Sequence, residues 1–114
     1  MEATIRIRLR SLARFIPELR QTCRVAAHQS SSRCAWCDGR GWTLHTSEDH
    51  CFRALVSWAR LHDLEVEIRA ADEIVLWRQV QGMATSEGYL GKGEPLAALV
   101  EAIEAAQRLG RASP

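Results

Sequence analysis

The chain has 114 residues, of which 46% are hydrophobic, 25% are charged and 6% are aromatic, and its net charge is +1. This length suits one domain, over residues 1–114, and this composition is that of an ordinary globular protein, which excludes fibrous and fully disordered classes. Because no run approaches the roughly 20 apolar residues that span a bilayer and no apolar signal segment opens the chain, we expect a cytoplasmic protein of bacterial or phage type without a membrane partner.

The small net charge hides an asymmetry along the chain. Residues 1–40 contain eight Arg and three acidic residues, for a net charge of +5, whereas residues 41–114 contain seven basic and eleven acidic residues, for −4. The basic part suits nucleic acid, an acidic protein surface or the acidic half of a second copy in a homodimer. Solvated Arg side chains on ordinary surface faces explain the same pattern.

The first predicted element is a strand over residues 3–9, because T-I-R-I-R-L-R alternates strictly between apolar and charged residues. A helix is expected next, since apolar residues recur at helical spacing from Leu12 to Cys23. Pro17 either kinks this helix or opens its main part. Residues 1–33 are thus predicted to form a basic strand–helix segment.

The middle of the chain is predicted to hold a short strand over residues 41–46, which follows a cysteine motif at residues 34–42. A helix then begins at Thr46 or Ser47, with acidic residues at its positive end. His62 and Asp63 close this helix. Its predicted apolar stripe consists of Phe52, Leu55, Val56 and Ala59.

The last third of the chain predicts an antiparallel hairpin, because residues 64–70 alternate between apolar and charged side chains and residues 74–80 return after a turn. The predicted inward face of the first strand consists of Leu64, Val66, Ile68 and Ala70. The glycine-rich residues 81–93 form either a mobile loop or a ragged strand with a turn. The last helix opens at Pro95, buries Leu96, Leu99, Val100 and Ile103, and is capped by Gly110. The tail, residues 111–114, is expected to fray.

These elements predict a small α+β domain in which helices pack on an antiparallel sheet, in the order β-α-knuckle-β-α-β-β-α. From residue 47 the order is helix, hairpin, helix, and the last helix contains P-L-A-A-L-V-E-A-I. Residues 47–110 thereby resemble the small α/β sandwich (αββα) domains of phage and prophage proteins. The resemblance implies a mobile-element or accessory origin and carries over no functional residue.

The motif C-A-W-C-D-G-R-G, which begins at Cys34, predicts a zinc knuckle because two cysteines in one tight turn supply two of the four ligands of a tetrahedral site. It resembles the C-x-x-C-x-G-x-G knuckle of DnaJ-type zinc-binding regions. That pattern occurs four times in DnaJ and once here, so the resemblance implies the local geometry only. We expect Zn²⁺ to be held by Cys34, Cys37, Cys51 and His50, in a treble-clef arrangement.

The second ligand pair is the open part of this prediction. His50 and Cys51 are adjacent on a helix and point about 100° apart, so Cys51 is the better ligand and His45, His50, Cys23 or His28 completes the set. Two other interpretations stay open. The cysteines are either buried thiols beside a glycine turn, without metal, or a redox pair, although D-G-R-G is poor helix sequence for the latter.

The functional prediction is a small non-enzymatic regulatory protein that binds another protein, such as a transcription factor or a defence complex, as an inhibitor or anti-activator. No phosphate loop, hydrolase motif or dinucleotide fingerprint is present. Trp and Arg are enriched at interface hot spots, so the predicted partner-binding residues are Trp58, Trp77, Arg6, Arg8 and Arg10. The alternatives are a zinc-knuckle nucleic-acid-binding module and a thiol-dependent enzyme.

Overall fold

The computed structural model describes residues 2–23, 41–79 and 86–110. The helices are α1 (Ala3–Leu12), the 3-10 turn η1 (Pro17–Leu19), α2 (Glu48–Leu61) and α3 (Pro95–Gly110). The strands are β1 (Arg20–Thr22), β2 (Trp42–Leu44), β3 (Leu64–Ala70), β4 (Glu73–Gln79) and β5 (Ser86–Lys92). The predicted α+β class, with antiparallel strands packed by helices, is confirmed.

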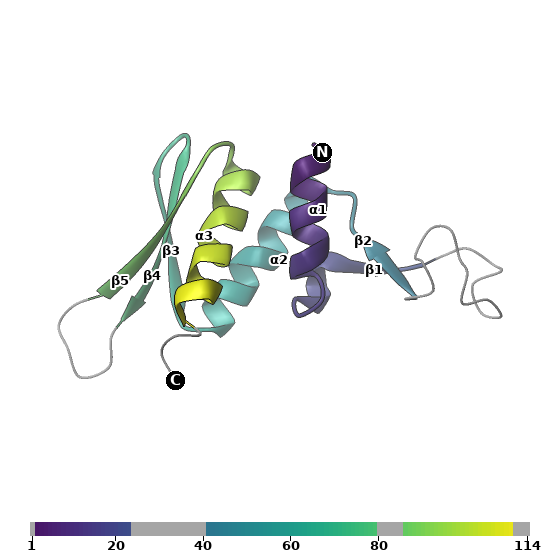
Figure 1. The fold of residues 1–114 in the computed structure, drawn as a ribbon, viewed down its shortest axis with the longest axis horizontal. Helices are drawn as coiled ribbons and strands as arrows, with labels where there is room; N and C mark the ends of the chain where they lie inside the picture. Colours follow the sequence, from purple (N-terminus) through teal and green to yellow (C-terminus); the bar gives the residue numbers. More distant parts are fainter. Residues whose placement is uncertain (1, 24–40, 80–85, 111–114) are drawn as a thin grey trace.

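The strands form two antiparallel sheets. β1 pairs with β2, and β3, β4 and β5 form a three-stranded sheet in chain order. α3 lies along one face of the larger sheet and contacts β4 and β5, while α2 contacts α3 and β3. α1 packs on the side of α3 that faces away from the sheet (Figure 1). The core therefore lies between the sheet, α3, α2 and α1.

The predicted strand over residues 3–9 is wrong, because this segment begins helix α1. Ile5, Leu9 and Leu12 are buried and lie on one side of the helix, whereas Ile7 between them is 64% exposed. When every second residue is apolar, residues four apart, such as Ile5 and Leu9, are also apolar and lie on one face of a helix. The pattern therefore fits both the strand repeat of two residues and the helix repeat of 3.6 residues. Packing of α1 against α3 decided in favour of the helix.

The long helix predicted after residue 12 is also wrong in the part that the structure describes. α1 ends at Leu12, and the chain continues through η1, which Pro17 opens, into β1. The Arg20 guanidinium donates hydrogen bonds to the carbonyl oxygens of Ala13 and Arg14, at 2.5 and 2.7 Å. These bonds satisfy carbonyl groups that follow the last turn of α1 and fix the reversal of the chain.

The elements predicted from residue 41 to 79 are confirmed with small shifts. The Ser47 hydroxyl accepts a hydrogen bond from the His50 backbone N–H at 3.2 Å, which makes Ser47 the N-cap of α2. α2 ends at Leu61 with His62 as its C-cap, and Asp63 has a positive φ of 59° that directs the chain into β3. The predicted inward face of β3 is only partly correct, since Leu64 is buried but Ile68, beside a bulge, is 64% exposed.

The glycine-rich stretch contains strand β5, and its residues 80–85 lie outside the described ranges. Gly91 of β5 explains part of this composition. A Cβ atom there would lie 1.7 Å from the Ala98 carbonyl oxygen, so α3 rests directly on the backbone of β5. The predicted inward residues of α3 are all buried: Leu96, Leu99, Val100 and Ile103. None of the helices in the described ranges is long and apolar enough to cross a membrane.

Candidate functional site

The outer face of the larger sheet is the strongest candidate for a functional surface. Ile74 and Leu76 of β4 point toward α3, so the alternate residues Val75 and Trp77 point to the other face. Within residues 2–23, 41–79 and 86–110, no helix or strand lies over that face (Figure 1). Among the described elements, the three-stranded sheet is therefore covered on one side only.

Trp77 occupies the centre of this face and is held there by three contacts. Its indole Nε1–H donates to Glu67 Oε2 at 2.7 Å, and the Arg69 guanidinium lies 5.5 Å from the ring centroid. The ring also covers Gly88 of β5, where a Cβ atom would lie 2.8 Å from Trp77 Cζ3. These contacts fix the orientation of a partly exposed tryptophan before any partner arrives.

The carboxylate of Glu67 connects these groups. It accepts one hydrogen bond from the indole N–H of Trp77 and a second from Arg69 Nε, the latter at 3.1 Å. Both hydrogen bonds favour the charged form, so they hold the pKa of Glu67 below its usual value, with the Trp77 bond as the larger cause. Val75, Leu90 and Glu65 complete the surface, which we name the Trp77 face: Glu65, Glu67, Arg69, Val75, Trp77 and Leu90.

The Trp77 face combines a central apolar strip with a charged rim. Val75 is buried beneath its neighbours, whereas Leu90 is 42% exposed beside it. Lys92 and Glu73, at the end of the strip, form an ion pair at 3.8 Å. An aromatic centre within a polar rim is the composition found in protein interfaces.

The predicted zinc site is only partly described, because Cys34 and Cys37 lie outside the described residues. Cys51 is fully buried, and its thiol donates to the His45 carbonyl oxygen at 3.4 Å. Burial and, to a lesser extent, the charge of Glu48 raise the pKa of Cys51 to about 11. In the part of the chain that the structure describes, no three His, Cys, Asp or Glu side chains are placed to hold a metal ion.

His50 and His45 contribute contacts that connect the start of α2 with η1. Their rings stack with centroids 3.7 Å apart, and His50 Nε2 lies 2.8 Å from the Glu18 carbonyl oxygen. The Ser47 backbone N–H donates to His45 Nδ1 at 3.3 Å. Desolvation, and secondly the neighbouring His50, lower the pKa of His45. The zinc ligand set stays a prediction, and the buried Cys51 thiol does not support a thiol-dependent enzyme.

The other predicted partner-binding residues do not gather around Trp77. Trp58 lies on α2, packs against the core and stacks on His62 with ring centroids 4.3 Å apart. Arg8 points toward α3, where its Nε donates to Glu104 Oε1 at 3.0 Å. Arg6 and Arg10 are exposed on α1, on the side of α3 away from the Trp77 face.

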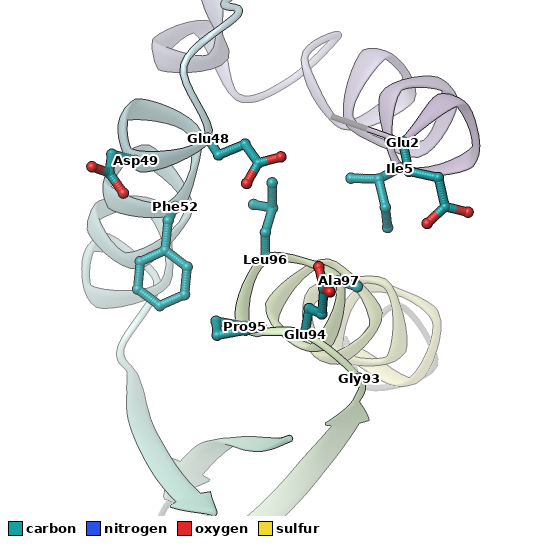
Figure 2. Close-up of a pocket in the computed structure, with 10 residues that line it drawn as sticks. All are labelled: Glu2, Ile5, Glu48, Asp49, Phe52, Gly93, Glu94, Pro95, Leu96 and Ala97. Carbon is teal, nitrogen blue, oxygen red and sulfur yellow. The ribbon is translucent and has the colours of Figure 1, made fainter. Parts of the chain in front are cut away.

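A pocket of about 680 Å³ lies where the three helices begin (Figure 2). Glu2 precedes α1, Glu48 opens α2 and Glu94 precedes α3, and the side chain of Leu96 lies among them. Carboxylates stabilise helix N-termini, which accounts for the acidic character of this pocket without a ligand. Sequence reasoning did not predict the pocket, since only the fold brings the three helix starts together.

Sequence reasoning found Trp77 but missed the residues that surround it. The pairing of residues 64–70 with 74–80 is the signal that predicts Glu65 and Glu67 beside Trp77. The chain was compared with protein-family models, with curated proteins and with solved structures, and none of the three comparisons gives a match. The resemblances to phage-type αββα domains and to the DnaJ knuckle therefore stay predictions.

Proposed function

We propose that this chain is a non-enzymatic regulatory domain that binds another protein in the cytoplasm through the Trp77 face. Binding there modulates the partner, for which a transcription factor or a defence complex is an example. The observation that supports this proposal is the arrangement of Trp77, which is fixed by Glu67, Arg69 and Gly88 on a sheet face that no described helix or strand covers.

Preorganisation is the physical reason why this arrangement favours binding. A tryptophan whose orientation is already set loses little conformational entropy when a partner covers it, so more of the burial energy appears as affinity. Trp and Arg at the centre of a patch, surrounded by polar groups that exclude water, are the usual composition of an interface hot spot. Trp77 and Arg69 meet both conditions.

The charges on the face indicate the chemistry of the partner. Glu67 is paired with Arg69 and Glu73 with Lys92, whereas Glu65 has no ion pair among the residues described. A matching surface therefore presents an apolar side chain to Trp77 and Leu90 and a basic side chain to Glu65. Such a pair of contacts fixes the register of the partner as well as adding affinity.

The test begins with the full chain as bait in a lysate of the source organism, followed by purification of each captured protein and titration calorimetry with the purified pair. We expect Trp77→Ala to weaken binding about thirtyfold or more, as for a hot-spot residue, and Glu65→Lys to weaken it about tenfold. Glu101→Lys, on the exposed side of α3, is the matched control and should leave affinity unchanged.

Two results would contradict the proposal. One is that no purified protein binds the wild-type chain. The other is a bound protein whose affinity responds to Glu101→Lys as strongly as to Glu65→Lys. Because Glu65 is exposed and its variant leaves the core intact, circular dichroism of Glu65→Lys separates a lost contact from a lost fold, even if Trp77→Ala is unstable.

A further inference from the structure

The outer side of α1 carries a second group of exposed side chains. Ile7 is 64% exposed and points away from the buried side of α1, which carries Ile5 and Leu9. Arg6, Arg10 and Arg14 are exposed around it, the last just beyond the end of the helix. We name these four residues the α1 outer face. Arg8 does not belong to it, because its guanidinium binds Glu104 of α3.

The basic residues of the α1 outer face are spaced four residues apart, or about 6 Å along a helix. Among residues 2–23, 41–79 and 86–110, none of the three has an ion-pair partner. Like charges at this spacing repel one another and destabilise the helix slightly. Arg6 is the fourth residue of α1, near the positive end of the helix dipole, where a cation is unfavourable.

The like-charge repulsion and the position of Arg6 cost stability, and no ion pair among the described residues offsets them, although Arg10 in the last turn is favourably placed at the negative end of the helix dipole. Ile7 adds a further cost, because a large aliphatic side chain is left in water instead of being buried. Unfavourable charge placement and exposed apolar side chains of this kind are typical of surfaces that serve a function. Three unpaired cations around one apolar side chain are complementary to a segment that carries carboxylates around an apolar residue.

We propose that the α1 outer face binds an acidic amphipathic segment of a protein, with Ile7 against an apolar side chain and Arg6, Arg10 and Arg14 against carboxylates. Ile7, together with Phe15, which is 42% exposed nearby in the chain, favours protein over nucleic acid, since a phosphate backbone offers no apolar contact. The net charge of +1 agrees with this choice, because nucleic-acid-binding domains are usually more basic.

This surface is separate from the Trp77 face. α3 lies between α1 and the larger sheet, so the two surfaces belong to elements that α3 separates (Figure 1). A protein on one surface therefore leaves the other accessible. The domain is suited to hold two proteins at once, and to link them without either displacing the other.

The experiment uses fluorescence anisotropy of a labelled synthetic peptide built of Glu and Leu at helical spacing, added to the full chain at low salt. We expect Arg6→Gln and Arg10→Gln each to weaken binding about threefold to fivefold, and Ile7→Ser by a similar factor. Arg60→Gln removes an exposed arginine of α2 and is the matched control, which should bind as the wild type does. Trp77→Ala should also retain binding, which separates this proposal from the proposed function.

A second peptide, with Ser in place of Leu, tests the apolar contact. It should bind the wild type more weakly than the first peptide, while Ile7→Ser should bind the two peptides equally, because the two changes remove one shared contact. The proposal is overturned if Arg60→Gln weakens binding as much as Arg10→Gln, or if the peptide does not bind. It is also overturned if a DNA duplex binds more tightly than the peptide, since the surface would then recognise phosphate.

Discussion

The guanidinium of Arg8 on α1 is paired with the carboxylate of Glu104 on α3, so that an ion pair joins the first and last helices of the chain. Both side chains are about one-third exposed, at 30% and 32%. The hydrogen bond from Arg8 to Glu104 is the main reason that the pKa of Arg8 is raised. The contact fixes the position of α1, whose other buried residues are few and aliphatic.

Removal of this pair should lower the stability of the fold modestly. We expect Glu104→Gln to decrease the free energy of unfolding by about 1 kcal/mol, because partly exposed ion pairs contribute at this level. Urea denaturation measures the change, and Glu65→Gln, which removes an exposed carboxylate of β3 with no ion pair among the residues described, is the control. An equal loss in both variants would show that the Arg8 contact adds nothing.

Gly91 and Gly88 of β5 should respond differently to substitution by alanine. A Cβ atom at Gly91 meets the backbone of Ala98 at 1.7 Å, so Gly91→Ala should separate α3 from the sheet and cost about 3 kcal/mol or more. A Cβ atom at Gly88 meets the ring of Trp77 at 2.8 Å instead of backbone, so the ring must shift and strain its hydrogen bond to Glu67, and Gly88→Ala should cost about 1 kcal/mol. Thermal unfolding of both variants checks the order, which a reversed ranking would contradict.

Trp77→Phe should change the titration of Glu67 without removing the aromatic ring. The variant lacks the indole N–H that donates to Glu67 and keeps the Arg69 contact, so the pKa of Glu67 should rise toward its ordinary value. An NMR titration of the Glu67 carboxyl carbon measures this shift. If the pKa stays where it is in the wild type, Arg69 alone lowers it, and the Trp77 bond is not formed in solution.

The stacked pair His45 and His50 should make the fold sensitive to acid. The folded state lowers the pKa of His45, so it binds fewer protons than the unfolded chain near that pKa. Stability from His45 is therefore fully present above its unfolded pKa of about 6.5 and is lost as the pH falls below it. Urea denaturation from neutral to mildly acidic pH should show this loss.

The variant His45→Gln separates this effect from other titrating groups. Without the imidazole, the decrease in the free energy of unfolding just below about pH 6.5 should become smaller than in the wild type. The decrease at lower pH, which arises from carboxylates, should be shared by both proteins. An identical pH profile for the variant would mean that His45 has the same pKa in the folded and unfolded chains.

Cys51 should resist alkylation in the native protein. Its side chain is fully buried and its pKa is about 11, so very little thiolate is present at neutral pH. Mass spectrometry after a short treatment with iodoacetamide should find Cys51 unmodified until denaturant is added. Rapid native alkylation of Cys51 would contradict the burial and would revive the interpretation of a reactive thiol.

The sequence predicted the second half of the fold better than the first, for a reason visible in particular residues. The alternation of apolar and charged residues from Leu64 onward predicts β3. Ser47 and Pro95 predict helix starts, because Ser is favoured at the N-cap and Pro at the first position of a helix. At the amino terminus, Ile5, Ile7 and Leu9 fit a strand as well as a helix. Only the tertiary contact with α3 selects between the two periods.

The candidate surface was predictable in part. Trp77 was selected from its residue type, and its pairing with Glu65 follows from the hairpin register. The contact with Gly88 depends on β5, and β5 lies in residues 81–93, for which the sequence predicts either a loop or a strand. The pairing of Arg8 with Glu104 was not predictable, because charge alone does not distinguish an arginine in solvent from one that binds a glutamate 96 residues away.

The short hairpin of β1 and β2 has a consequence for how the chain can change. The Cys23 backbone N–H donates to the Gly41 carbonyl oxygen at 3.1 Å, and Thr22 is paired with Trp42. Cys23 and Gly41 are therefore held side by side by backbone pairing, whatever the sequence that joins them. A short turn that links these two residues directly should leave the β1–β2 register intact.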